Sequence, residues 1–334
     1  MTVRIPYEEM EREFRRVLMK HGFSEERAAL GARLFTETSL DGVYSHGANR
    51  FPMYIDYVRR GIVRVYAEPE RVAAFGSLER WDGKLGPGNL NAWTCMGRAI
   101  ELAREHGSGC VALRNTNHWM RGGTYGRRAA DENCIAVCFT NAIPGMPPWG
   151  ASENRVGNNP FVLAVPRRDG HIVLDMALSQ FSYGRMEAHR MSGEPLPVPG
   201  GFDSDGHLTD DPGKILGGGT VLPVGYWKGS GLALVLDLIA AILSDGWTTE
   251  RIAREKDEFS VSQVFLTFSL DRLGSDGLAE RLAREVVDYI HTAQPVEGGG
   301  VVFVPGERTM RTRRENRVKG IPVNNDVWEA IKTL

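Results

Sequence analysis

Residues 108–140 read SGCVALRNTNHWMRGGTYGRRAADENCIAVCFT, and this stretch indicates the fold class. It contains two short apolar runs, Cys110–Leu113 and Cys134–Thr140, which have the length expected of buried strands. A helical pattern near Tyr125–Asp131 lies between the two runs. This order of strand, helix and strand is typical of an α/β protein.

The same alternation continues on both sides of this stretch. We expect further helices and strands at Leu90–Glu105, Phe161–Val165, Ile172–Asp175, Ser230–Ser244, Val261–Leu270, Leu278–Thr292 and Val301–Val304, with a Gly/Pro-rich excursion at Met191–Gly225. Interleaving of this kind predicts an α/β fold in which helices flank a parallel or mixed β-sheet core.

Both ends of the chain are predicted to be helical. Apolar residues recur at helical spacing from Met10 to Leu18, and Ser24 suits a helix N-cap. A further helix is expected from Pro52 to Gly61, and the tail returns to helix at 308–319 and 325–334. We therefore expect a helical N-terminal segment at 1–74, an α/β core at 75–295, and a C-terminal segment at 296–334 that packs back on the N-terminal part.

The charge balance excludes several classes of function. The 334 residues include 40 Lys plus Arg against 42 Asp plus Glu, so the formal net charge is −2. That balance provides no field to hold a polyanion, and a nucleic-acid partner is not expected. The N-terminus mixes acids and bases, and the most apolar run contains Asp237, so neither a signal peptide nor a membrane span is expected.

The four cysteines indicate a reducing compartment. No pair has CxxC spacing, and Cys134 and Cys138 are expected to lie on one face of the same strand. We expect free thiols and a cytoplasmic protein.

The usual nucleotide and catalytic motifs are missing. No GxGxxG follows a strand, no GxxxxGK[ST] is present, and Gly86-Pro87-Gly88 lacks the third glycine. No HExxH or other local metal-ligand pair and no GxSxG is found, so no metal is expected and a hydrolase is not favoured. Any nucleotide must therefore be bound by a fold without the glycine fingerprint.

Three polar segments could carry chemistry. Segment 43–51 places Ser45, His46 and Arg50 between two helices, and a histidine beside an arginine suits proton transfer next to a carboxylate. Segments 114–123 and 141–150 each follow a strand at its carboxyl end, where α/β proteins place ligand-binding loops.

Structural roles explain the same residues without a ligand. His46 could cap helix carbonyls while Arg50 joins a surface ion pair. The two later segments could be satisfied loops, and Asp175, at the end of a strand, could face solvent or a ligand's hydroxyl groups. Both interpretations remain open on these residues alone.

The motifs taken together resemble one family. VYSHGANRFP, LRNTNHWMRGGTYG, MPPWGA, LPVPGGFD, GYWKGSG and FVPGER, in this order and spacing, resemble the malate/L-lactate dehydrogenase family, which is unrelated to the Rossmann-fold enzymes of similar name. The resemblance runs from near residue 8 to residue 334. It implies a non-Rossmann NAD(P)-binding fold, and NADH-dependent reduction of a 2-oxo sugar acid by a homodimer, with NADPH as the alternative cofactor.

The resemblance also implies roles for individual residues. It places the acid/base histidine at His46, a second catalytic candidate at His118, and the substrate contacts at Ser45, Arg50 and Asn117. The implied cofactor contacts are His171, Ile172, Val173, Leu174, Asp175, Met176, Ala177, Trp227, Lys228, Gly306, Glu307 and Arg308.

This chain departs from the family pattern at Ala142 and Ala177, where close relatives carry serine. Rival functions are the oxidation or reduction of another 2-hydroxy or 2-oxo acid, such as malate, lactate, sulfolactate or ureidoglycolate, or reduction of a cyclic imino acid. A non-catalytic module that binds a nucleotide or a sugar acid is the alternative outside enzymes.

Overall fold

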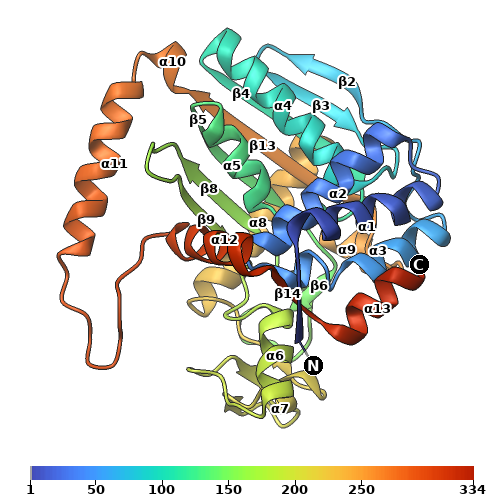
Figure 1. Cartoon of the computed structure of the whole chain (residues 1–334), viewed down its shortest axis with the longest axis vertical. Coiled ribbons are helices and arrows are strands. Elements are labelled where there is room, and N and C mark those ends of the chain that lie inside the picture. The colour runs from blue at the N-terminus through green and yellow to red at the C-terminus, as the bar shows by residue number, and fades with distance from the viewer. Residues whose placement is uncertain (1) are drawn as a thin grey trace.

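A seven-stranded mixed sheet forms the centre of the computed structural model, which describes residues 2–334 (Figure 1). In spatial order its strands are β2 (Glu70–Phe75), β3 (Leu78–Asp82), β4 (Ser108–Thr116), β13 (Val261–Ser269), β5 (Cys134–Thr140), β8 (Phe161–Val165) and β9 (Ile172–Met176). The pair β3 and β4 is parallel, and the other neighbours in this sheet are antiparallel. The predicted α/β class with a mixed sheet and flanking helices is confirmed.

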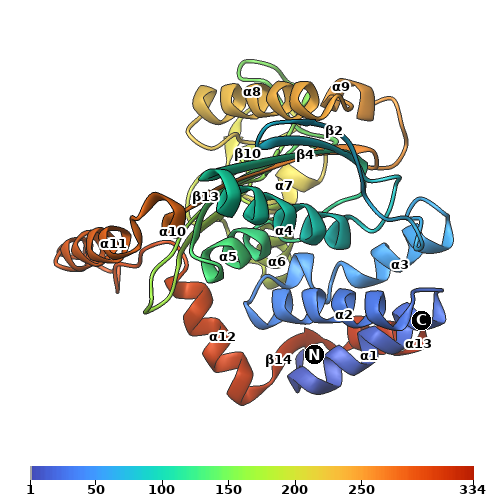
Figure 2. The same ribbon diagram turned by 90° about the horizontal axis from the view of Figure 1, so that it is seen from above.

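Helices cover both faces of this sheet (Figure 2). On one face lie α4 (Gly88–His106) and α5 (Gly123–Asp131), against the alternating small side chains Cys134, Ala136 and Cys138 of β5. On the other face lies α8 (Trp227–Ser244), whose residues Ala233, Leu236 and Ala240 are buried in a second core. The four cysteines are free, as predicted.

The apolar helix α8 has two different faces. Its length of 18 residues and mean hydropathy of 1.5 would allow it to cross a membrane, and 39% of it is buried. The buried face of α8 packs on the sheet, so part of the high hydropathy of this helix comes from residues of the protein core. The outer face exposes an apolar row made of Leu234, Val235, Leu238, Ile239 and Ile242.

The N-terminal helices form a further layer beyond α4 and α5 (Figure 2). This layer consists of α1 (Tyr7–Lys20), α2 (Glu25–Leu40) and α3 (Phe51–Arg59), and Phe14, Phe35 and Phe51 lie in its core. Its first helix and the Ser24 cap of α2 are confirmed.

The tail joins the same layer through α12 (Glu307–Lys319), β14 (Ile321–Asn324) and α13 (Asn325–Thr333). Strand β14 pairs antiparallel with β1 (Thr2–Ile5). The domain boundaries near residues 74 and 295 stay a prediction.

Several elements differ from those expected. Val301–Val304 is not a strand, because no neighbouring strand offers it hydrogen bonds, and Val301 is exposed. Strands β2 and β3 were not predicted, since β2 is exposed along nearly its whole length and lacks a buried alternation.

The Gly/Pro-rich excursion contains a small sheet of β10 (Gly201–Phe202), β11 (Leu208–Thr209) and β12 (Thr220–Val221), with α7 (Pro212–Leu216). The remaining short or peripheral elements are η1 (Tyr44–His46), β6 (Pro144–Met146), β7 (Val156–Gly157), α6 (Tyr183–Ser192), α9 (Thr249–Ile252), α10 (Leu270–Leu273) and α11 (Asp276–His291).

The strand directions place several polar segments at one edge of the sheet. Strands β4 and β5 both run antiparallel to β13, so they point the same way. Strand β9 also points this way, because two antiparallel steps separate it from β5. The carboxyl ends of β4, β5 and β9 and the start of β13 therefore meet at this edge.

Candidate active site

A cleft of about 1530 Å³ opens at this edge of the sheet. Residues from all three polar segments singled out in the sequence line it, namely 43–51, 114–123 and 141–150. The starts of α3, α6 and α12 complete its walls. The structure thus brings together segments that are far apart along the chain.

The short helix η1 carries Ser45 and His46 into this cleft. It is folded closely against α2, because a Cβ added to Gly47 would lie 2.1 Å from the Ser39 Oγ. The same Oγ accepts a hydrogen bond of 2.9 Å from the Ala48 N–H. Ser45 Oγ lies 2.9 Å from His46 Nδ1, so the imidazole is oriented by its neighbour and its Nε2 has no hydrogen-bond partner among the described residues.

His118 follows β4 and lies beside His46, with the ring centroids 5.7 Å apart and the planes inclined by 27°. Its Nδ1 accepts a hydrogen bond of 2.9 Å from the Met120 N–H. A backbone N–H only donates, so this contact requires an unprotonated Nδ1 and places the ring proton on Nε2. Burial lowers the pKa of His118 well below its usual range, and His118 is therefore a neutral imidazole at neutral pH.

His46 has a less extreme environment. Burial lowers the pKa of His46, and Arg50 and Arg121 act in the same direction. Asp175 opposes them because its negative charge favours the imidazolium. Of the two rings, His46 is the one with a carboxylate that supports a change of protonation.

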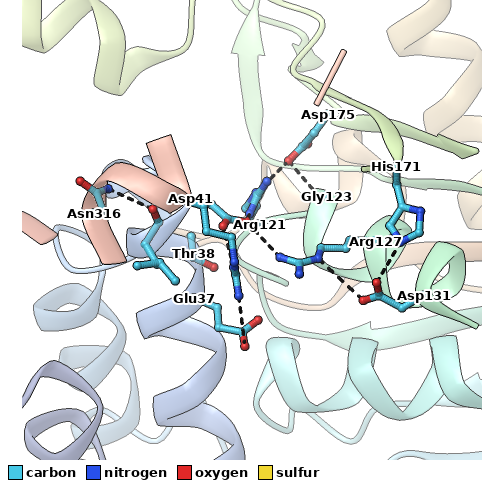
Figure 3. Close-up of polar contacts among 12 residues, drawn as sticks. Glu37, Thr38, Asp41, Arg121, Gly123, Arg127, Asp131, His171, Asp175 and Asn316 are labelled. Atoms are coloured by element: carbon cyan, nitrogen blue, oxygen red, sulfur yellow. Dashed lines mark hydrogen bonds and ion pairs between the residues drawn. The ribbon is translucent and has the colours of Figure 1, made fainter. Parts of the chain in front are cut away.

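Asp175 is held by an ion-pair network that reaches into the helical layer (Figure 3). Its Oδ2 accepts a hydrogen bond of 2.9 Å from the Gly123 N–H and lies 3.5 Å from Arg121 Nε. Arg121 pairs with the buried Asp41, and Arg313 of α12 donates to the same carboxylate at 2.7 Å. The network fixes Asp175 in place through the buried Asp41.

Arg50 is the N-cap residue of α3, lines the cleft and makes no hydrogen bond through its side chain to the described residues. Its guanidinium lies 3.9 Å from Glu258 Oε2, which is beyond hydrogen-bond distance, and its side chain is 29% exposed. The guanidinium thus keeps its donors available for a carboxylate. Asn117, implied as a substrate contact, does not line the cleft of this chain, and its amide nitrogen lies within hydrogen-bond distance of the backbone carbonyls of Ile62, Leu85 and Gly86.

The implied cofactor residues divide into two groups. Residues of β9 and of the α12 start line the cleft, namely His171, Val173, Leu174, Asp175, Ala177, Gly306 and Arg308. Ile172 and Met176 do not line it, and Glu307 instead contacts His291 at 3.1 Å and the Val304 N–H at 2.9 Å. Trp227 and Lys228 also lie outside it, and Trp227 is 64% exposed.

The residues present fit a dinucleotide beside a small acid. The cleft is larger than the roughly 300–1,000 Å³ typical of a small-ligand pocket. Arg127, Arg185 and Arg308 line it and provide positive charge for phosphate groups. Close approach of the α12 start to β9 is possible because Gly306 has no side chain, and a Cβ there would lie 2.7 Å from the His171 carbonyl oxygen.

Sequence reasoning missed Asp41 and Glu258. Asp41 is the C-cap of α2, a position where the helix dipole disfavours a carboxylate. An acidic residue at the end of a predicted helix could therefore have indicated a cationic partner. Glu258 precedes β13 at the cleft edge. Its position required the strand directions, which the sequence pattern did not reveal.

Comparisons with known proteins agree with the fold and the motifs. A family model described as malate/L-lactate dehydrogenase matches residues 5–332. A 2,3-diketo-L-gulonate reductase of Citrobacter koseri is 44% identical over 99% of this chain and all of that protein, and one of Escherichia coli is 43% identical over the same shares. Among solved structures, sulfolactate dehydrogenase from Methanocaldococcus jannaschii has a TM-score of 0.90 at 28% identity, covering 99% of this chain and 96% of that one. A Δ1-piperideine-2-carboxylate reductase from Pseudomonas syringae has a TM-score of 0.87 at 27% identity and covers 99% of each chain.

Proposed function

This chain belongs to the malate/L-lactate dehydrogenase family of oxidoreductases, and from that premise we propose that it reduces 2,3-diketo-L-gulonate to 3-keto-L-gulonate with NADH. The substrate rests on two full-length relatives at 43 and 44% identity that carry this reductase name. The solved relatives named for other acids are more distant, at 27 and 28%. Family membership removes the non-catalytic binding module as an alternative.

The observation that carries the chemistry is the meeting of His46, His118 and Arg50 in one cleft. NADH, when bound, supplies a hydride to the C2 carbonyl carbon. His46, as the imidazolium that the negative charge of Asp175 favours, gives its Nε2 proton to the oxygen of that carbonyl and becomes a neutral imidazole. Arg50 holds the substrate carboxylate through charge-assisted hydrogen bonds.

His118 acts as a neutral donor in this proposal. Its tautomer is set by the Met120 N–H, so its Nε2–H is available to hydrogen-bond the carbonyl oxygen. The hydrogen bond polarises the carbonyl and stabilises the developing alkoxide without transfer of the His118 proton. This division gives each histidine a distinct role in the same step.

A substrate panel tests the proposal. Purified protein is mixed with NADH or NADPH and with 2,3-diketo-L-gulonate, pyruvate, oxaloacetate, sulfopyruvate or a cyclic imino acid, and absorbance at 340 nm is followed. We expect the highest kcat/KM with 2,3-diketo-L-gulonate and NADH. If another panel member gives a higher kcat/KM, that compound becomes the proposed substrate. If NADPH gives a higher kcat/KM than NADH, NADPH becomes the proposed cofactor.

We also propose a cytoplasmic homodimer. Trp227 and Lys228 lie outside the cleft of their own chain, and the apolar outer row of α8 begins within two turns of them. In this proposal a second copy covers the row, and Lys228 of the partner subunit contributes to the cofactor cleft. The four free thiols suit a reducing compartment.

Mixed variants test the dimer. A chain with His46→Ala and a chain with both Trp227→Ala and Lys228→Ala are coexpressed, and light scattering gives the mass. If the two sites act across a dimer, each mixed dimer keeps one intact cleft and activity returns, whereas neither variant alone is active. A monomeric mass, or no activity in the mixed dimer, would contradict the proposal.

A further inference from the structure

One acidic side chain of the cleft has no role in the chemistry above. Glu258 lies between α9 and β13, at the edge where β4 and β5 end, and it lines the cleft together with Arg50, Tyr57 and Ile143. Its side chain is 12% exposed. Burial of a carboxyl group costs free energy, so its presence here requires an explanation.

The segment that carries Glu258 is anchored to α3. The neighbouring Asp257 turns away from the cleft and forms an ion pair with Arg60, just after the end of α3. Glu258 turns inward and accepts a hydrogen bond of 3.1 Å from the Ile143 N–H through Oε1. Of these two adjacent carboxylates, Asp257 thus points toward Arg60 and Glu258 points into the cleft.

The second oxygen of Glu258 is free. Oε2 lies 3.9 Å from the Arg50 guanidinium and accepts no hydrogen bond from the described residues. Burial raises the pKa of Glu258, while the Ile143 N–H and Arg50 favour its ionised form. A glutamine could accept the Ile143 N–H equally well, so that hydrogen bond does not explain the charge.

The charge of Glu258 changes what Arg50 offers to a ligand. The permanent cations of this part of the cleft are Arg50 and Lys256. His118 is a neutral imidazole in its buried setting, and His46 is charged only while it carries the proton that it transfers. Glu258 offsets one of the two cations. One net positive charge remains, and a substrate with one carboxylate neutralises it, whereas a second negative group would find no unpaired cation and would be repelled by Glu258.

We propose that Glu258 is a specificity-determining residue that selects singly charged, hydroxyl-bearing 2-oxo acids over dianionic ones. Its charge disfavours a second carboxylate or a sulfonate, and its free Oε2 accepts a hydrogen bond from a hydroxyl group of the substrate chain. The inference rests on the proposed function, because it takes a 2-oxo acid bound at Arg50 as its starting point. In this way Glu258 would favour the singly charged sugar acid over the doubly charged malate-type and sulfolactate-type substrates.

The decisive experiment compares the wild type with Glu258→Gln on three substrates. These are 2,3-diketo-L-gulonate, pyruvate, which has one charge and no hydroxyl group, and oxaloacetate, which has two charges. We expect Glu258→Gln to raise the oxaloacetate-to-pyruvate ratio of kcat/KM about tenfold or more. The ratio of 2,3-diketo-L-gulonate to pyruvate should fall, because an amide at this position no longer offers a charged acceptor.

Two further variants serve as controls. Glu255→Gln removes the same charge from a residue outside the cleft, three positions before Glu258, and should leave both ratios unchanged. Glu258→Asp keeps the charge and should retain most of the discrimination against oxaloacetate. Unchanged ratios in a folded Glu258→Gln protein, or an equal effect of Glu255→Gln, would overturn the inference.

A binding measurement keeps the inference testable if Glu258→Gln does not fold. Oxamate and oxalate have nearly the same shape but carry one and two negative charges. Calorimetry on the wild-type protein with NADH should show tighter binding of oxamate, and tighter binding of oxalate would overturn the inference. Failure of the wild type to reduce 2,3-diketo-L-gulonate would instead count against the proposed function, since both charge comparisons can still be made.

Discussion

The polar groups on the two sides of the cleft are held in opposite ways. Asp41, Arg121 and Arg313 belong to an ion-pair network that reaches from α2 to α12. His46 Nε2 has no hydrogen-bond partner among the described residues, and the Arg50 guanidinium has only the distant carboxylate of Glu258. The paired groups support the site, whereas the unpaired groups are available to a ligand, so substitutions on the two sides should affect different properties.

The largest effect on turnover is expected from His46→Ala. Loss of a positioned proton donor should lower kcat by about 10² to 10⁴, with the affinity for NADH and the Tm nearly unchanged. Steady-state kinetics at 340 nm and NADH fluorescence titration measure these quantities. Full activity of His46→Ala together with an inactive His118→Ala would exchange the two roles.

The largest effect on stability is expected from Asp41→Asn. This change removes the buried negative charge that Arg121 and Arg313 share, leaves Arg121 only its 3.5 Å contact with Asp175, and should destabilise the protein by about 3–5 kcal/mol. Denaturant unfolding measures the difference. Asp56→Asn, which breaks an exposed pair of 3.4 Å with Arg60, is the matched control and should cost about 1 kcal/mol or less.

Arg50→Ala should act mainly on substrate affinity. Loss of a charge-assisted clamp corresponds to about 1.5–3 kcal/mol, which is a rise of about 10- to 100-fold in KM. The affinity for NADH should not change, and kinetics with 2,3-diketo-L-gulonate test both points. An unchanged KM with a lowered kcat would show that Arg50 acts on the reaction step instead of on binding.

The smallest effect is a dependence of stability on pH that arises from His118. Burial lowers its pKa in the folded state, so below about pH 6.5 the unfolded chain binds more protons than the folded one. This contribution to stability is therefore complete above pH 6.5 and is lost as the pH falls through the folded-state pKa. Thermal melts from pH 7.5 to 5 should show a steeper decline for the wild type than for His118→Asn, whose Oδ1 can still accept the Met120 N–H. Parallel curves would contradict a buried neutral His118.

The sequence predicted local elements well wherever one face is buried. The alternation of Cys134, Ala136 and Cys138 matched β5 to the residue, because each of these side chains packs under α4 and α5. Strand β2 gave no such pattern, since most of its residues face solvent. The opposite error occurred at Val301–Val304, where apolar residues have no strand beside them.

The order of the strands could not be predicted from periodicity. Alternating helices and strands favour parallel neighbours, yet β13 inserts between β4 and β5 and makes both pairs antiparallel. This insertion also brings Glu258 to the cleft. For the same reason, the two motifs that contain His46 and His118 were recognised, but the acidic group between α9 and β13 was not.

Some residues of the recognised motifs could not be assigned a contact from the sequence. Asn117 belongs to the motif containing His118, but its amide serves three backbone carbonyls. Trp227 and Lys228 begin α8, are exposed and do not line the cleft of their own chain, so the single chain does not show which group they would contact. Motif membership predicts the neighbourhood of a residue, and its role depends on contacts that only the assembled chain defines.

The contact between Arg313 and Asp41 joins residues that are 272 positions apart. Next to it, Asn316 donates to the Leu40 carbonyl and to the hydroxyl of Tyr44, the first residue of the short helix that bears His46. During synthesis on the ribosome, this corner must therefore wait for most of the chain to emerge before it can close. A product that stops before Arg313 would lack this corner, and with it the contacts that hold the start of the short helix bearing His46.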